Sequence, residues 1–251
     1  MSGHSKWSTI KRKKAATDAK RGNLFTRLAR EISVAAREGG GDQDTNVALR
    51  LAVDRAKSNN MPKDNIERSI RRGTGEEKEG SKFEQIMYEG YAPHGVALMI
   101  EVVTDNRNRT VADLRHQLIK GGGNLADAGA VSWQFVRSAY FVIMAGSTDP
   151  EAIFEAMVEA GAEDVILGEE DIEIIAPVEA YKAISDALES MEVRADEASL
   201  RMIPTSVVSL PAGESLQVMR MIENMEDLDD VQGVFSNLDV TDEAVALLET
   251  A

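Results

Sequence analysis

The chain has 251 residues, of which 43% are hydrophobic and 28% charged, a composition typical of folded proteins with room for two or three domains. It contains no cysteine, which excludes disulfides, thiolate catalysis and cysteine-ligated metal sites, and three histidines too widely spaced to form a metal motif. It has no apolar run long enough to cross a membrane, and its N-terminus lacks the apolar segment of a secretory signal. We therefore expect a cytoplasmic protein without a cofactor.

The net charge of −15 is unevenly distributed along the chain. Residues 1–75 hold 17 Lys and Arg against 8 Asp and Glu, whereas residues 76–251 hold 11 against 35. Because salt screens charge over about 8 Å at physiological ionic strength, a basic segment keeps its attraction for phosphate even on an acidic protein. The pattern predicts a nucleic-acid partner. The alternative is that the basic segment docks onto acidic parts of the same chain.

The first 21 residues are rich in lysine and arginine and contain a single acid. Few of them are large and apolar, so we expect the segment to be mobile until it meets a partner. Its candidate nucleic-acid contacts are Lys6, Lys11, Arg12, Lys13, Lys14, Lys20 and Arg21. Trp7 lies among these residues. Its ring could stack on an unpaired base or, alternatively, anchor the segment to the folded protein.

Residues 23–75 have the pattern of three short helices that form a bundle. The first has apolar residues at helical spacing, with Arg27 and Arg30 on its other face, and ends at the glycines 39–41. Asp44 is the expected N-cap of the second helix, which ends near Ser58. Pro62 is expected in the first turn of the third helix. That helix leaves three arginines outside, which are Arg68, Arg71 and Arg72.

From about residue 80 the pattern changes to strands. Two strands, 87–95 and 96–105, are joined by a Pro-Gly turn, and Thr110 with Asp113 resembles a capping box that starts a helix. That helix should end at the triple glycine 121–123, and a strand is predicted at 131–136. Residues 138–203 then give the order βαββαβ of a ferredoxin-like domain.

After residue 204 a short strand, a helix over about 214–225 and a strand over 231–238 would complete the earlier partial unit. The sequence thus predicts an α+β fold of three domains, a helical bundle and two ferredoxin-like α+β domains, one inserted in the other. The expected boundaries are 1–79 for the basic helical domain, 80–137 with 204–251 for the discontinuous domain, and 138–203 for the inserted domain.

The segment 104–110 is a second candidate phosphate site. Arg107 and Arg109 are expected just before a helix N-terminus, where free backbone N–H groups attract anions. Equally, Asn106, Asn108 and Thr110 could only close a turn and cap a helix, with the two arginines solvated. The sequence lacks the common phosphate-loop, nucleophile-elbow and zinc-protease motifs, which favours a protein that is not an enzyme. Acidic clusters, such as those at 169–173 and 227–230, are interpreted as solvated turns.

Several motifs together resemble the YebC/PmpR family. They are GHSKW at 3–7, DAKRGNLFTRLAREI at 18–32, NNMPKDNIERSI at 59–70, YEGYAPHG at 88–95 and DNRNRT at 105–110. The resemblance implies a three-domain layout and two possible roles, transcriptional regulation on promoter DNA or translation through proline runs on the ribosome. The chain departs from the family pattern at Ala92, His94 and Ala126, where glycine is usual.

We therefore predict a non-enzymatic, nucleic-acid-binding regulator of gene expression. Its partner would be ribosomal RNA on the ribosome or promoter DNA, with RNA slightly favoured because a basic tail without an evident recognition helix suits irregular RNA. No membrane and no small-molecule substrate is expected. The alternative is an acidic protein-interaction scaffold that makes no direct contact with nucleic acid.

Overall fold

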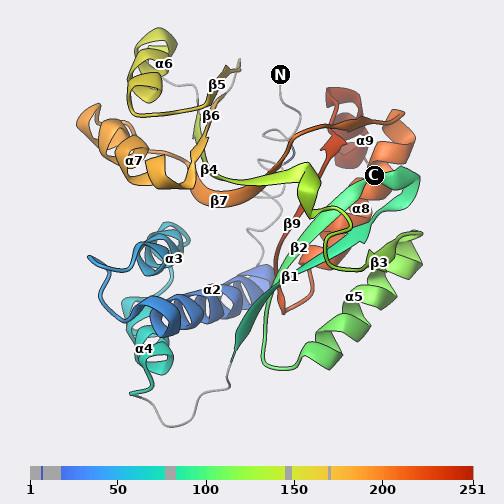
Figure 1. Ribbon diagram of the computed structural model, residues 1–251, viewed down its shortest axis with the longest axis horizontal. Coiled ribbons are helices and arrows are strands. Elements are labelled where there is room, and N and C mark those ends of the chain that lie inside the picture. The colour runs from blue at the N-terminus through green and yellow to red at the C-terminus, as the bar shows by residue number, and fades with distance from the viewer. Residues whose placement is uncertain (1–6, 8–17, 77–82, 145–148, 169–170, 251) are drawn as a thin grey trace. The chain divides into compact units, whose positions relative to one another are not determined.

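The computed structural model describes residues 7, 18–76, 83–144, 149–168 and 171–250 (Figure 1). The chain forms two compact units. The helical–sheet unit comprises residues 12–131 and 217–236, and the acidic unit comprises residues 1–11, 132–216 and 237–251. The helical–sheet unit holds 22 Lys and Arg against 22 Asp and Glu, whereas the acidic unit holds 6 against 21. The acidic unit therefore carries the whole net charge of −15.

Three helices form the bundle that the sequence predicted: α2 (Asp18–Gly39), α3 (Val47–Ser58) and α4 (Lys63–Thr74). Their apolar faces enclose a common core that includes Leu28, Ile32, Leu49, Val53 and Ile66. Helix α4 ends at a left-handed Gly75, with φ of 81°, a conformation that glycine commonly adopts just after a helix. Pro62 is the N-cap of α4 and precedes the first turn in which it was expected.

The N-cap of α3 is Asn46, and the prediction of Asp44 was wrong. The Asn46 side chain is buried, accepts a hydrogen bond of 3.0 Å from Leu49 N, and donates one of 2.8 Å to Ala35 O in α2. One amide therefore caps α3 and joins it to α2, whereas a carboxylate offers acceptors only and could not donate to Ala35.

A four-stranded antiparallel sheet completes the helical–sheet unit. Its order is β3-β1-β2-β9, formed by β1 (Glu84–Tyr91), β2 (Ala97–Thr104), β3 (Asn124–Ala126) and β9 (Val231–Ser236). The predicted turn between β1 and β2 is the short 3₁₀ segment η1 (Pro93–Gly95). In it His94 has φ of 63°, the left-handed conformation that favours glycine, which explains why a glycine suits this position.

Helix α5 (Arg107–Gly121) begins earlier than the sequence predicted. Its N-cap is Asn106, whose Oδ1 accepts a hydrogen bond of 3.1 Å from Arg109 N. Thr110 therefore lies in the first turn, where it is buried, and the predicted capping box with Asp113 was wrong. The helix ends at left-handed Gly122, within the triple glycine that predicted its end. Residues of α8 (Ala212–Glu226) from 217 onward belong to the same unit.

The acidic unit contains a second four-stranded antiparallel sheet with the order β5-β6-β4-β7. Its elements are β4 (Phe135–Met144), α6 (Pro150–Glu159), β5 (Asp164–Leu167), β6 (Asp171–Pro177), η3 (Val178–Ala180), α7 (Tyr181–Ser190) and β7 (Glu197–Pro204). The succession βαββαβ is the predicted ferredoxin-like one. Both helices pack on one face of the sheet, where Phe141, Ile153, Ile174 and Ile184 are fully or almost fully buried.

The strand predicted at 131–136 was correct only for its last two residues. Residues 132–134 form the 3₁₀ turn η2 (Ser132–Gln134), and the residues after it begin the long strand β4. Phe135 already pairs with Pro204 of β7, so the cross-strand ladder extends further toward the N-terminus than the residue pattern indicated.

The acidic unit also contains a short parallel pair, β8 (Val208–Ser209) with β10 (Leu238–Asp239), and the unpredicted helix α9 (Asp242–Thr250).

Candidate nucleic-acid interface

The basic N-terminal segment falls almost entirely outside the described residues. This applies to Lys6, Lys11, Arg12, Lys13 and Lys14. Lys20 and Arg21 belong to the first turn of α2, but their side chains are outside the description. Trp7 is described and is 5% exposed. The burial of this ring is what the anchoring alternative requires, whereas stacking on a base requires an accessible face.

Arg27 and Arg30 on α2 are held by the loop between α8 and β9. Arg27 Nη1 donates to Glu226 O at 2.8 Å, and burial lowers the pKa of this guanidinium despite the nearby charge of Glu226. Arg30 Nη1 donates to Asp229 O at 2.7 Å and to Asp230 Oδ1 at 2.8 Å. Acceptors of the protein itself therefore occupy both arginines, which is the arrangement that the alternative of docking within the chain describes.

The other predicted arginines of the bundle face solvent. Arg68, Arg71 and Arg72 are exposed on α4. Among the residues that the structure describes, neither Arg68 nor Arg72 has an ion-pair partner. Both side chains therefore keep their charge available for a phosphate group. Lys63 in the first turn of the same helix differs, because it pairs with Glu67 one turn later.

A fourth arginine, Arg37, belongs with this group through the packing of α4 on α2. A Cβ atom added to Gly73 would lie 2.4 Å from Ser33 O and 2.7 Å from Ala36 Cβ, so the last turns of the two helices are in direct contact. Arg37 occupies the last turn of α2 and is exposed, as Arg71 and Arg72 are in the last turn of α4. We call the group Arg37, Arg68, Arg71 and Arg72 the arginine cluster.

Arg37 was not among the contacts predicted from the sequence, although the sequence contains a signal for it. Each of α2 and α4 has arginine in its last turn, followed by glycine. Cations at helix C-termini also interact favourably with the helix dipole, by typically about 0.3–1 kcal/mol at exposed sites. If these arginines have a purely structural role, their removal should lower the stability of the folded protein. If they bind nucleic acid, their removal should lower the affinity for nucleic acid.

The second candidate site, at the start of α5, is engaged by carboxylates. Arg107 pairs with Glu84 of β1. Arg109 Nη2 lies 3.0 Å from Asp105 Oδ1 and 2.8 Å from Asp230 Oδ2, and it is still half exposed. Asn106 caps the helix, as in the turn-closing alternative, but the two arginines are paired with carboxylates, whereas that alternative had them solvated. A phosphate at this helix N-terminus would have to compete with three carboxylates of the protein.

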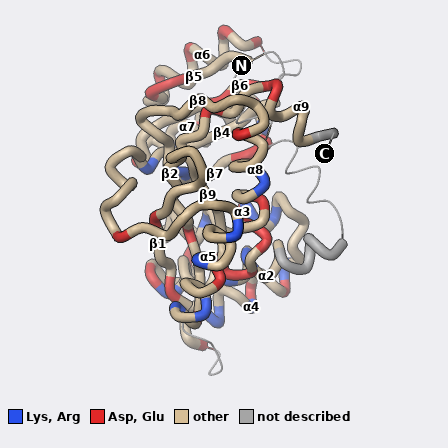
Figure 2. Tube along the Cα trace, turned by 90° about the vertical axis from the view of Figure 1, so that its right-hand side faces the viewer, with Lys and Arg blue, Asp and Glu red and all other residues tan. Residues whose placement is uncertain are grey.

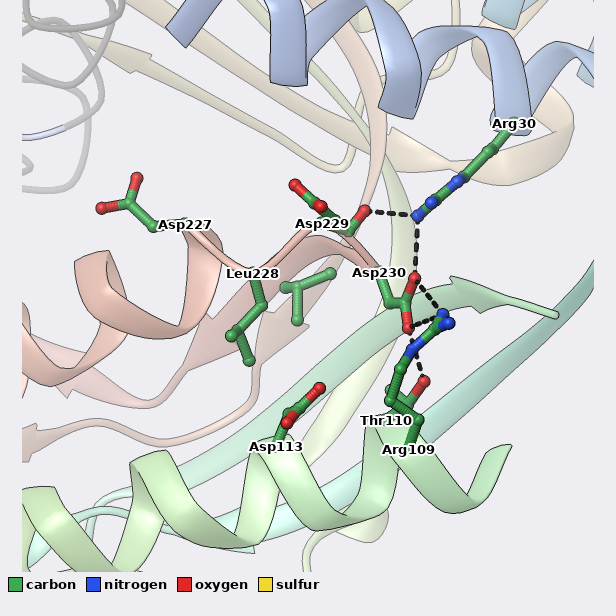
Figure 3. A pocket seen from close by; sticks show the side chains of 9 residues that line it. Arg30, Arg109, Thr110, Asp113, Asp227, Leu228, Asp229 and Asp230 are labelled. Atoms are coloured by element: carbon green, nitrogen blue, oxygen red, sulfur yellow. Dashed lines mark hydrogen bonds and ion pairs between the residues drawn. The ribbon is translucent and has the colours of Figure 1, made fainter. Parts of the chain in front are cut away.

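Asp230 is the centre of this network, as Figure 3 shows. Its carboxylate accepts hydrogen bonds from Arg30 and Arg109, and from the hydroxyl groups of Thr110 at 2.7 Å and Thr104 at 3.1 Å. The interpretation of the 227–230 cluster as a solvated turn was therefore wrong for Asp230, which is buried, although Asp227 and Asp229 are exposed. Glu173 is a second buried acid, and it accepts from Tyr140 at 2.6 Å.

The hydrogen bonds decide the ionisation of Asp230. Burial alone raises the pKa of this carboxyl, but the hydrogen bonds from Arg109, Thr110 and Thr104 and the charge of Arg109 outweigh burial and hold the pKa below 3.8. The same hydrogen bond and charge raise the pKa of Arg109. Asp230 is therefore an anion at neutral pH that joins α2, α5 and the segment before β9.

The pocket beside this network has a volume of about 440 Å³. Its lining includes two arginines, Arg30 and Arg109, and four aspartates, Asp113, Asp227, Asp229 and Asp230. With four aspartates against two arginines, the net formal charge of the lining is negative, which disfavours a phosphate ligand. Among the described residues no group of acids and histidines has the arrangement of a metal site. None of the described helices is long and apolar enough to span a membrane.

The fold and this surface define a class: a mixed helix-and-sheet protein with a helical N-terminal region, antiparallel sheets and a surface cluster of arginines. Two family models cover most of the chain. The model of the TACO1/YebC N-terminal domain matches residues 5–76, and that of the second and third TACO1/YebC domains matches residues 83–238. The chain belongs to the TACO1/YebC family.

Full-length relatives agree with this assignment. A probable transcriptional regulatory protein of Syntrophus aciditrophicus is 47% identical over 248 residues, 99% of each chain. One of Chlorobium luteolum is 48% identical over 250 residues, 99% of this chain and all of the relative. A crystal structure of a conserved hypothetical protein from Aquifex aeolicus is similar with a TM-score of 0.82 and 42% identity, over 90% of this chain and 93% of that one.

Proposed function

We propose that this protein is a non-enzymatic, cytoplasmic regulator of gene expression that binds nucleic acid through the basic N-terminal segment and the arginine cluster. The relatives are named probable transcriptional regulatory proteins, which supports a regulatory role. The proposed contacts in the N-terminal segment are Lys6, Lys11, Arg12, Lys13, Lys14, Lys20 and Arg21. Arg27 and Arg30 contribute indirectly, because they hold α2 on the sheet.

The single observation that carries the proposal is the contrast between the two groups of arginines in the bundle. Arg27 and Arg30 are occupied by the loop before β9, whereas Arg68 and Arg72 have no ion-pair partner among the described residues. The guanidinium groups of Arg68 and Arg72 on α4 can bind phosphates in bidentate fashion. The acidic unit carries the whole net negative charge, and it would oppose nonspecific binding elsewhere on the protein.

We favour ribosomal RNA over promoter DNA as the target. Arginines at helix ends and a basic sequence segment can follow an irregular phosphate backbone, whereas major-groove readout uses a recognition helix or a two-stranded β-ribbon that fits into the groove. On RNA the protein would act as a translation factor that eases stalls at proline runs. On promoter DNA it would act as a transcriptional regulator.

A binding experiment with the full-length protein separates the two targets. Binding to purified ribosomes, to a ribosomal RNA fragment and to duplex promoter DNA is measured over a range of salt concentrations. We expect tighter binding to ribosomes or ribosomal RNA at physiological salt. Sequence-specific retention of DNA without ribosome binding would overturn the preference for RNA.

The competing function, an acidic interaction scaffold, is favoured by one observation, the concentration of the net charge in the acidic unit. The variant K11Q/R12Q/K13Q/K14Q removes four positive charges and retains Trp7, which is buried. If the proposal is correct, this variant binds ribosomes and RNA more weakly. Unchanged binding, both in this variant and in R68A/R72A, would favour the scaffold.

A further inference from the structure

Helix α6 of the acidic unit presents an apolar surface to solvent. Phe154 and Val158 lie one turn apart on this helix and are 42% and 49% exposed. Their neighbours Ile153 and Met157 are fully buried against the sheet, so the helix has a second apolar face in addition to the one that packs. Leu167 is also exposed, and it lies on the same face of the edge strand β5 as Val165, which belongs to the core under α6.

A row of glutamates borders this apolar pair. Glu151, Glu155 and Glu159 follow each other at four-residue intervals and are all exposed. At 100° per residue they lie within an arc of about 80° directly beside Phe154 and Val158. Figure 2 marks acidic positions in red on α6 and beside β5. Among the described residues no lysine or arginine pairs with any of the three.

This arrangement is locally unfavourable for the helix. Like charges one turn apart repel each other, and Glu159 stands at the C-terminal end, where the helix dipole already concentrates negative charge. The last turn of α6 contains no basic residue. The 44 residues from 138 to 181 contain eleven Asp and Glu and no Lys or Arg, so the chain itself supplies no nearby cation in that stretch.

We propose that this α6 surface docks a cationic amphipathic helix of a protein partner. Apolar side chains of the partner, at three- or four-residue spacing, would pack on Phe154 and Val158, and lysines or arginines beside them would pair with the glutamate row. Charge complementarity selects this occupant. A nucleic acid would be repelled by the same glutamates, and a second copy of the acidic unit would bring two negative surfaces together.

The probe is a synthetic peptide of leucine and lysine with helical spacing of the leucines. A peptide of the same composition, scrambled so that the leucines share no face, serves as its control. The binding of each to the full-length protein is measured by fluorescence anisotropy at physiological salt, and the contacted residues are mapped by backbone amide chemical shifts. We expect tighter binding of the amphipathic peptide and the largest shifts along α6.

Two variants test the site. F154S/V158S removes the apolar anchors and should weaken binding of the amphipathic peptide by about tenfold or more, because buried anchors dominate the affinity of such interfaces. The control I119S changes a residue of α5 that is 64% exposed, and it should leave the affinity unchanged. E151Q/E155Q/E159Q should weaken binding and reduce its dependence on salt.

The outcomes that would overturn the proposal are specific. Equal affinity for the two peptides, or shifts spread evenly over α6 and the acidic positions of α7, would show attraction by net charge alone. Equal affinities of F154S/V158S and I119S would exclude the apolar pair as an anchor. If F154S/V158S loses its helical circular dichroism, the glutamine variant and the shift map decide the question by themselves.

Discussion

Arg30 in α2 donates a hydrogen bond of 2.8 Å to Asp230, a residue 200 positions later in the sequence. The exposed fractions of the two side chains are 16% and 8%, so this ion pair is largely removed from water. Arg109 shares the same carboxylate from the start of α5. One aspartate therefore fixes the bundle that carries the arginine cluster to the sheet of the helical–sheet unit.

The variant D230N should destabilise the protein by about 2–3 kcal/mol. Removing one partner of a buried ion pair costs about 3–5 kcal/mol, and the expected value is lower here because Arg109 is half exposed and keeps Asp105. The measurement is urea unfolding followed by circular dichroism. D229N is the matched control, since Asp229 is exposed and binds Arg30 through its backbone carbonyl. Equal midpoints for D230N and D229N would contradict the central role of Asp230.

The stabilisation by Asp230 should also depend on pH. Because the folded-state pKa lies below the ordinary value of 3.8, the contribution is complete above that pH and is lost as the pH falls through the folded-state pKa. The difference in unfolding free energy between the wild-type protein and D230N should therefore be constant from pH 7 to about pH 4.5 and shrink below 3.8. A difference that is the same at pH 3 as at pH 7 would show that ionisation is not its cause.

Most helices and strands could be predicted from the sequence, because their signals are local. The apolar spacing of the bundle, the glycine after α4 and the triple glycine after α5 each lie within a few residues of the element that they define. The role of Asp230 could not be predicted in this way. Its partners Thr104, Thr110 and Arg30 are more than 100 residues away in sequence, and an aspartate in an acidic turn has the same local pattern whether it is solvated or buried.

The caps illustrate a second limit of local signals. Asp44 and Asn46 are both good N-cap residues, and the Asn46 amide also donates to the carbonyl of Ala35 in α2, a contact that the local sequence pattern does not reveal. The candidate interface shows the same limit. Four arginines of α2 and α4 have similar local patterns, yet Arg27 and Arg30 face the loop before β9, whereas Arg68 and Arg72 face solvent.

Removal of two arginines from the cluster should change the salt dependence of nucleic-acid binding. Each phosphate contact contributes about 0.9 to the slope of log affinity against log salt on duplex DNA and about 0.7 on single strands. R68A/R72A should therefore reduce the slope by about 1.4 on single-stranded RNA. Filter binding over a salt series measures this slope.

The control for this prediction is R115A, which removes an exposed arginine of α5 outside the cluster. Its slope should match that of the wild-type protein. If R68A/R72A binds as the wild type does and only lowers the melting temperature, the arginines stabilise the ends of the helices and do not contact phosphate.

The contact between α2 and α4 that assembles the arginine cluster depends on Gly73. Because an added Cβ would meet the Ser33 carbonyl at 2.4 Å, and backbone cannot move aside as a flexible side chain can, G73A should destabilise the protein by about 1–3 kcal/mol. Gly213 in α8 is the control, since a Cβ there meets nothing within 4 Å and alanine in a helix is favourable by about 0.5–1 kcal/mol. Urea unfolding should thus move the midpoints of G73A and G213A in opposite directions. A neutral G73A would mean that the two helices can separate at this contact without cost, and the packing of α4 on α2 would then not fix the arginine cluster.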